Sequence, residues 1–131
     1  MKLTKKIVVS LVMAMSMATL SSTTFAAEKK DLNAVVREAA EGTIAKIEEA
    51  IVLVEKGGNQ DAAVAAINEA RQLQKEFRYE LTERQRQKAN DKLKVAREAV
   101  VSGNDKEADE TLKATLSEFK EMKATYDASH K

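Results

Sequence analysis

The sequence predicts an all-α protein, an antiparallel four-helix bundle made of two helical hairpins. Three observations carry this prediction: apolar residues recur every three or four positions, glycine-containing turns separate the periodic stretches, and the two halves of the chain are alike. Strict alternation of apolar and polar residues, which is typical of strands, does not occur along the chain. The predicted bundle domain is residues 27–131, after an N-terminal segment of different composition.

The N-terminal segment, residues 1–26, has the three-part layout of a secretory signal peptide. Three lysines lie within the first six residues, an uncharged and largely apolar run extends from Ile7 to Leu20, and a short polar stretch follows. The apolar run is too short to span a bilayer comfortably, although an uncleaved anchor is the alternative. We therefore expect cleavage after about Ala26 and a periplasmic or secreted location.

Composition limits what the mature chain can do. Removing residues 1–26 leaves 105 residues and changes the formal net charge from +1 to −2, because three lysines leave and no acid does. This balance gives no argument for a nucleic-acid partner, and no later apolar run approaches the length of a transmembrane span. The chain has no cysteine, so we expect neither a lipoprotein nor a disulfide, and apolar packing must hold the fold.

The first hairpin is predicted from two apolar stripes on either side of Gly57-Gly58. Glycine tolerates the left-handed conformation that follows a helix, so the first helix should end there. Asn59 or Asp61 is placed to cap the second helix, and Gln74 interrupts the second stripe. The stripe positions are Leu32, Val36, Ala40, Ile44, Ile47, Ile51 and Val54, then Ala63, Ile67, Ala70 and Phe77, with Leu73 beside the second stripe.

The second hairpin begins at Leu81-Thr82-Glu83-Arg84-Gln85, where Thr82 and Gln85 have the spacing of a capping box. Ser102-Gly103-Asn104-Asp105 should end the third helix and cap the fourth. An offset of 45 residues places Gly103-Asn104 on Gly58-Asn59 of the first hairpin. Two such hairpins can bury their stripes against each other. The stripe positions here are Ala89, Leu93, Ala96 and Val100, then Ala108, Leu112, Thr115, Leu116, Phe119, Met122 and Tyr126.

Carboxylates are the only realistic metal ligands in this chain, because it offers no cysteine and, after the leader, one methionine and one histidine. Oxygen ligands favour hard divalent cations, here with weak affinity. The acids at 105–110 do not form a calcium loop, since Glu110 stands where glycine is needed and Leu116 where a bidentate acid is needed. A solvated surface is the alternative. The candidate ligands are Glu48, Glu49, Asp105 and Asp109.

Two further features suggest interaction surfaces. Residues 51–54 are apolar on every side of one helical turn, so Val52 or Leu53 should be partly exposed as a homodimer contact or a client-binding patch. The alternative is that the end of the bundle buries more of this helix. Residues 71–97 contain nine basic and four acidic residues, an excess that attracts anionic lipid, polysaccharide or an acidic client, or that simply solvates the bundle end.

No nucleophile–base pair is recognisable, so we expect a non-enzymatic protein. The only histidine, His130, is expected to be a solvated residue of a frayed C-terminal tail (127–131) rather than a metal or haem ligand.

A family resemblance extends over about residues 40–123. It is carried by Glu49-Ala50-Ile51, Glu55-Lys56-Gly57-Gly58 and Glu69-Ala70, and in the second half by Leu93, Ala96, Glu98, Gly103 and Ala108. These residues are similar to the periplasmic small metal-binding protein family, and the resemblance implies a bundle that binds divalent metals. That family binds its metals through many histidines along the helices, and this chain lacks them.

Two other resemblances are local. Val54-Glu55-Lys56 and Asn59 resemble the soluble b-type cytochrome bundle of the periplasm, but its haem-ligating methionine and histidine align with Ile44 and about Lys123, so haem is not expected. Leu81-Thr82-Glu83-Arg84-Gln85 matches the Leu-Thr-x-x-Gln signature of the Spy and CpxP stress chaperones, which implies binding of unfolded clients. Weak cation buffering is thus the first expected function. A holdase-like chaperone is the second, and a structural envelope component is the third.

Overall fold

The computed structural model describes residues 31–130, and within this range the chain is helical with no strand. Its long helices are α2 (Leu32–Lys56), α3 (Gln60–Leu73), α4 (Glu83–Val101) and α5 (Asp105–Ser129). Two 3-10 turns, η2 (Gln74–Glu76) and η3 (Glu80–Thr82), connect α3 to α4. The predicted all-α four-helix bundle is confirmed, whereas the predicted leader and its cleavage point lie outside the described residues.

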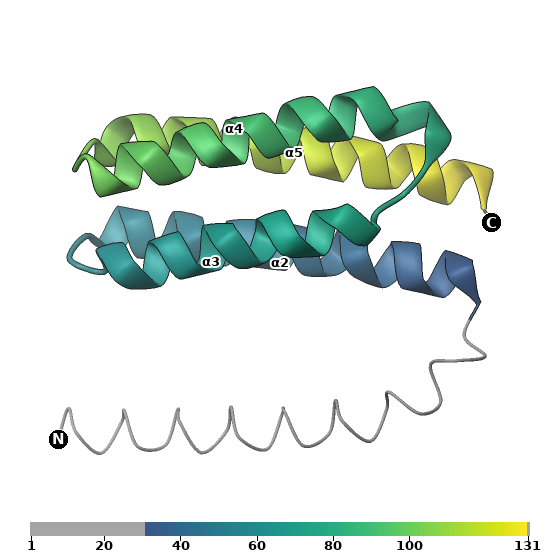
Figure 1. Cartoon of the computed structure of the whole chain (residues 1–131), viewed down its shortest axis with the longest axis horizontal. Helices are drawn as coiled ribbons and strands as arrows, with labels where there is room; N and C mark the ends of the chain where they lie inside the picture. Colours follow the sequence, from purple (N-terminus) through teal and green to yellow (C-terminus); the bar gives the residue numbers. More distant parts are fainter. Residues whose placement is uncertain (1–30, 131) are drawn as a thin grey trace, which may run out of the picture. The chain divides into compact units, whose positions relative to one another are not determined.

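Each helix lies beside two others, and in Figure 1 α3 and α4 lie in front of α2 and α5. Contacts between residues far apart in sequence fix which ends meet. Gln60, the first residue of α3, reaches Val100 near the end of α4, and Tyr126 near the end of α5 reaches Asn33 at the start of α2. These contacts are compatible with the predicted antiparallel hairpins.

The core follows the predicted stripes closely. Ile47, Ile67, Leu93, Leu112 and Phe119 are fully buried, and together they come from all four helices. Leu32 is the exception, since it is the first residue of α2 and is 79% exposed. The stripes also missed small buried residues beside them, where only a short side chain fits between closely approaching helices. These residues are Ala39, Thr43, Ala50, Ala66 and Ala99.

Both predicted glycine turns occur. Gly57 and Gly58 have φ of 74° and 72°, and Gly103 has φ of 80°. At the end of α4 the Gly103 N–H donates to the Val100 carbonyl and the Asn104 N–H to the Ala99 carbonyl, at 3.0 and 2.8 Å. This pair of bonds is the Schellman arrangement, which requires the left-handed conformation that glycine tolerates.

The predicted side-chain caps are wrong. Asn59 stands at the N-cap position of α3, but its amide donates to the backbone carbonyl of Gly57, at 3.2 Å. The Thr82 hydroxyl donates back to the Tyr79 carbonyl, because the preceding 3-10 turn directs it there, and the Gln85 amide reaches a carboxylate of α5. The helix starts therefore lack the side-chain bonds that the sequence spacing suggested.

Candidate functional sites

The four predicted cation ligands do not meet in one place. Glu48 lies 3.7 Å from Lys120, whereas Asp109 lies 3.1 Å from Lys113. These two lysines are separated by two helical turns of α5, about 10 Å. Glu49 pairs with Lys46 on the same helix, at 3.2 Å. Among residues 31–130, no group of three or more histidine, aspartate or glutamate side chains could hold a metal ion.

Asp105 and Asp109 nevertheless share one surface hollow, of about 290 Å³, which Glu55 of α2 also lines. The Lys113 ammonium donates to Glu55 at 2.9 Å and to Asp109 at 3.1 Å, and these hydrogen bonds raise the pKa of Lys113. The other carboxylate oxygen of Asp109, Oδ1, is buried and has no hydrogen-bond partner. A cation in this hollow would therefore compete with Lys113 for the carboxylates.

The interface between α2 and α5, which we call the α2–α5 interface, carries a regular series of ion pairs. Lys113, Lys120 and Lys123 of α5 face Glu55, Glu48 and Glu41 of α2, at 2.9, 3.7 and 4.0 Å. All are at least partly exposed, so each pair contributes little to stability. Their effect is to neutralise the lysines of this side of the bundle.

The interface between α3 and α4 has different chemistry. We define the α3–α4 interface by four polar residues, Asn68 and Arg71 of α3 with Asn90 and Arg97 of α4. Arg71 Nε donates to Asn90 Oδ1, and Arg97 Nη1 donates to Asn68 Oδ1, each at 3.3 Å. The amide oxygens orient the two guanidinium groups but carry no charge to neutralise them.

A polar cluster closes this interface where α3 ends. Gln74, the residue that interrupts the predicted stripe, is only 2% exposed, and its amide donates to the Arg71 carbonyl at 2.7 Å. Arg86 of α4 donates to both the side-chain and backbone oxygens of Gln74, and to the carboxylate of Glu83. The hydrogen bond from Arg86 lowers the pKa of Glu83 below its ordinary value. Sequence reasoning found Gln74 but not its partners.

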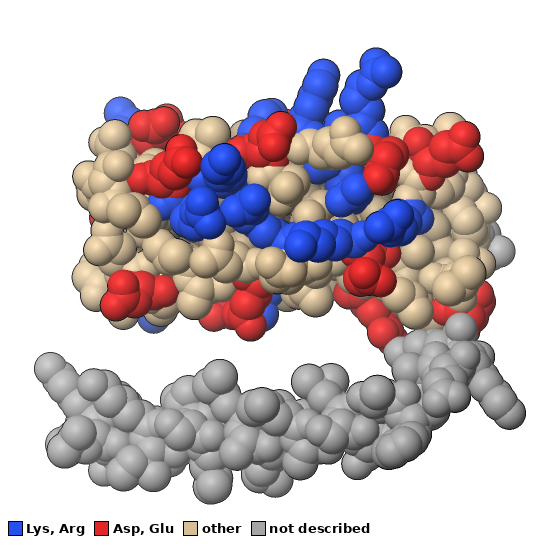
Figure 2. All heavy atoms as spheres, in the orientation of Figure 1, with Lys and Arg blue, Asp and Glu red and all other residues tan. Residues whose placement is uncertain are grey.

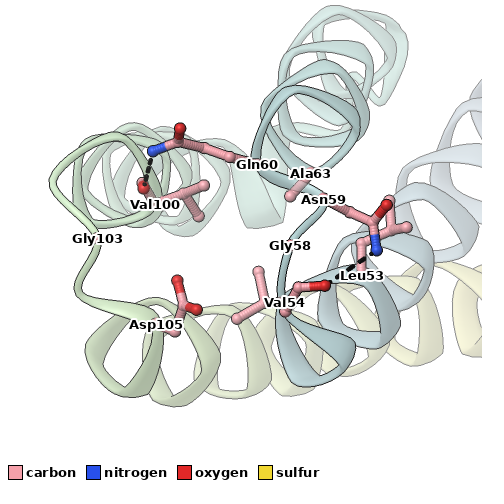
Figure 3. A pocket seen from close by; sticks show the side chains of 10 residues that line it. Leu53, Val54, Gly58, Asn59, Gln60, Ala63, Val100, Gly103 and Asp105 are labelled. Carbon is pink, nitrogen blue, oxygen red and sulfur yellow. Dashed lines mark hydrogen bonds between the residues drawn. The ribbon is translucent and has the colours of Figure 1, made fainter.

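At the opposite end of the bundle, the glycine turns enclose a small cavity of about 180 Å³ (Figure 3). The Gln60 amide donates to the Val100 carbonyl at 2.6 Å and to the Val101 carbonyl at 3.0 Å, so α3 supplies the cap of α4. Figure 3 shows Val54 and Asp105 facing the same space from α2 and α5. The cavity is smaller than ordinary small-molecule pockets, so we assign it no ligand.

The two residues of the predicted apolar patch, Val52 and Leu53, differ in how far they are exposed. Val52 is 49% exposed on the outside of α2, whereas Leu53 packs against the core and lines the cavity beside the glycine turns. Their role as an interaction patch remains a prediction.

His130 is held in place at the other end of the bundle, because α5 continues to Ser129 instead of fraying after Tyr126. Its ring stacks on Tyr126 with 3.9 Å between ring centroids, and Nδ1 lies 2.8 Å from the Tyr126 carbonyl oxygen. Tyr79 packs edge-on against both rings. The expectation of a frayed, solvated tail is wrong here, since the helix continues to Ser129 and the aromatic contacts partly bury the histidine.

Comparisons of this chain with protein-family models, curated proteins and solved structures found no match. None of the helices within residues 31–130 is both long enough and apolar enough to cross a membrane.

Proposed function

We propose that the protein is a small, exported, non-enzymatic binding protein that takes up divalent cations weakly at the Asp105–Asp109 hollow. The observation that carries this proposal is the buried carboxylate oxygen of Asp109, which has no hydrogen-bond partner. A second carboxylate, Asp105, lies one helical turn away and lines the same hollow. A hard cation would supply the missing partner.

The chemistry of the hollow favours calcium or magnesium, which take oxygen ligands. Weak affinity is expected for two reasons: few carboxylates converge, and Lys113 already occupies the space between Glu55 and Asp109. A bound cation has to displace the ammonium, so the binding should increase when Lys113 is removed. Glu48 and Glu49 take no part, because they lie farther along α2 beside their own lysines.

Thermal melts with calcium, magnesium and zinc, with a chelator as control, test the proposal. A cation at ten times its dissociation constant stabilises the fold by about 1.4 kcal/mol, which raises the Tm of a domain this size by roughly 5–10 °C. Asp109→Asn should abolish the shift, Lys113→Gln should enlarge it, and Asp91→Asn on the outside of α4 should leave it unchanged. Absence of any shift at millimolar cation, in the wild type and in Lys113→Gln alike, contradicts cation binding.

The exposure of Val52 favours a second candidate, a holdase-like protein that binds unfolded clients. The test is suppression of aggregation of a reduced client protein. Val52→Glu should remove the suppression without unfolding the bundle, because this side chain is half exposed. Leu53 is unsuitable for that test, since its side chain packs against the core. Equal suppression by Val52→Glu and the wild type rules out this patch.

Export is part of the proposal and has its own measurement. The intact mass of the protein recovered from the envelope fraction of an exporting host should correspond to a chain that begins at Ala27. A full-length mass in the cytosolic fraction contradicts export.

A further inference from the structure

We propose that the face formed by α3 and α4 docks the protein on an anionic phospholipid membrane surface. This inference is independent of cation binding, which concerns the other side of the bundle. It rests on three observations: the distribution of charge, the neutral partners of the arginines, and two exposed apolar residues at the ends of α4.

Charge is strongly separated within the described residues. Residues 71–97 hold nine basic and four acidic residues, a net charge of +5, while the rest of 31–130 holds seven basic and sixteen acidic residues, a net charge of −9. Figure 2 shows lysine and arginine side chains following one another across the face that α3 and α4 present in that view. An anionic surface therefore attracts this face and repels the remainder, which orients the molecule.

The partners of the basic side chains differ between the two sides. On the α2–α5 interface, Lys113 and Lys120 already face carboxylates. On the α3–α4 interface, Arg71 and Arg97 donate to asparagine oxygens, which fix their positions and leave their charge uncompensated. Asn68 and Arg71 are three residues apart, so the two Arg–Asn pairs lie about one helical turn, roughly 5 Å, apart along α3. Guanidinium groups with free N–H donors are well suited to phosphate oxygens.

Exposed apolar side chains favour a membrane over a linear polyanion as the partner. Leu81, in η3 just before α4, is 74% exposed, and Val101, the last residue of α4, is 61% exposed. Val101 follows Arg97 by four residues and so lies on the same side of α4. Basic residues combined with exposed apolar side chains are typical of proteins that lie on a bilayer surface. A sulfated or phosphorylated polymer in water gives no such role to leucine or valine.

Co-sedimentation with vesicles tests the proposal. The vesicles contain phosphatidylcholine and phosphatidylglycerol in a ratio of about two to one, with phosphatidylcholine alone as reference. Wild type and variants are all produced from the full chain, so the N-terminal residues are identical in every sample. Each basic residue near an anionic surface contributes about fivefold to partitioning, so Arg71→Gln/Arg97→Gln should weaken binding about 25-fold at low salt. Added salt should weaken wild-type binding as well.

The matched control is Lys113→Gln/Lys120→Gln, which removes the same charge from the α2–α5 interface and should leave binding nearly unchanged. Arg71→Lys/Arg97→Lys keeps the charge and should retain most of the binding, whereas Leu81→Ser/Val101→Ser should weaken it with little dependence on salt. Circular dichroism melts verify that each variant is folded.

Three outcomes overturn the proposal. The first is equal vesicle binding by the wild type and Arg71→Gln/Arg97→Gln, and the second is an equal loss in that variant and in the lysine control. The third comes from a parallel experiment with dextran sulfate: loss of polymer binding in Arg71→Gln/Arg97→Gln, without loss of vesicle binding, identifies a linear polyanion as the partner instead.

Discussion

The α2–α5 and α3–α4 interfaces lie on opposite sides of one bundle, and each joins its two helices through a different kind of polar contact. Lysines of α5 meet glutamates of α2 in matched order, so charge is cancelled locally. Arginines of the α3–α4 interface meet asparagines, and a buried glutamine closes its end. The lysines of one side are neutralised by carboxylates, whereas the two arginines of the other side keep their charge.

This difference separates polar residues that maintain the fold from those that keep free charge at the surface. Exposed lysine–glutamate pairs contribute little free energy and can be changed at low cost. Arg86 and Gln74 form a partly buried cluster in which each donor and acceptor depends on the other. Arg71 and Arg97 stand between these cases, since they are oriented by the fold and yet keep free charge. This ranking predicts that substitutions in the buried cluster lower the stability more than substitutions in the exposed ion pairs.

Arg86→Met should have the largest effect. It removes the donor to the buried side-chain oxygen of Gln74, and a buried acceptor left without a partner costs about 2–3 kcal/mol of the free energy of unfolding. Urea unfolding followed by circular dichroism measures the loss. Arg84→Met, an exposed arginine of the same helix, is the control and should change the stability by less than about 0.5 kcal/mol. Equal stabilities for the two variants would show that the cluster does not hold the end of the interface.

Gln60→Ala should have an intermediate effect at the other end of the α3–α4 interface. The Gln60 amide caps two carbonyls at the end of α4, so its removal should cost about 1 kcal/mol. Gln87→Ala, on the exposed side of α4, provides the comparison. Faster hydrogen exchange at the last turn of α4 in Gln60→Ala alone is the expected local sign, and unchanged exchange contradicts the cap.

Acid should weaken the Arg86–Glu83 pair. Arg86 lowers the pKa of Glu83 from its ordinary value of 4.5, so the pair stabilises the fold fully above that value. The contribution is lost as the pH falls through the lowered pKa of the folded state. Because Glu83 is about a third exposed, solvent screening limits the effect to less than about 1 kcal/mol. Unfolding measured between about pH 6 and pH 3 should depend less on pH in Glu83→Gln than in the wild type, with Glu80→Gln as control.

Lys120→Gln should have the smallest effect. Lys120 and Glu48 are both about half exposed and lie 3.7 Å apart, so breaking the pair should change the free energy of unfolding by less than about 0.5 kcal/mol. The small difference should vanish at high salt. If Lys120→Gln lowered the free energy of unfolding as much as Arg86→Met, the ion pairs of the α2–α5 interface would stabilise the fold as strongly as the Arg86–Gln74 cluster, contrary to this account.

Most of the fold could be predicted because apolar periodicity and glycine punctuation are local properties of the chain. Gly57-Gly58 and Gly103 end their helices as expected, and the buried stripes follow the spacing. Capping was not predictable from spacing alone. At the start of α4 the side chain of Gln85 is drawn to a distant residue, Glu121, and the end of α4 is capped by Gln60 of another helix.

The candidate sites depended still more on long-range pairing. The sequence identified the carboxylates and the basic stretch, but not which acids stand beside which lysines. Glu48 and Asp109 both carry carboxylates that could bind a cation. Only the packing of α2 against α5 shows that the two residues lie in different places, beside different lysines. The asparagine partners of Arg71 and Arg97 gave no sequence signal, because exposed and interfacial asparagines look alike in one sequence.

Nuclear Overhauser contacts provide the most direct test of the bundle and its two unlike interfaces. We predict cross-peaks from the Gln60 side-chain amide to Val100 and Val101, and from the Arg97 side chain to the Asn68 amide, together with contacts between the Tyr126 ring and Asn33. Cross-peaks that pair Arg97 with a carboxylate-bearing neighbour instead, or a spectrum without these contacts between helices, would contradict the arrangement.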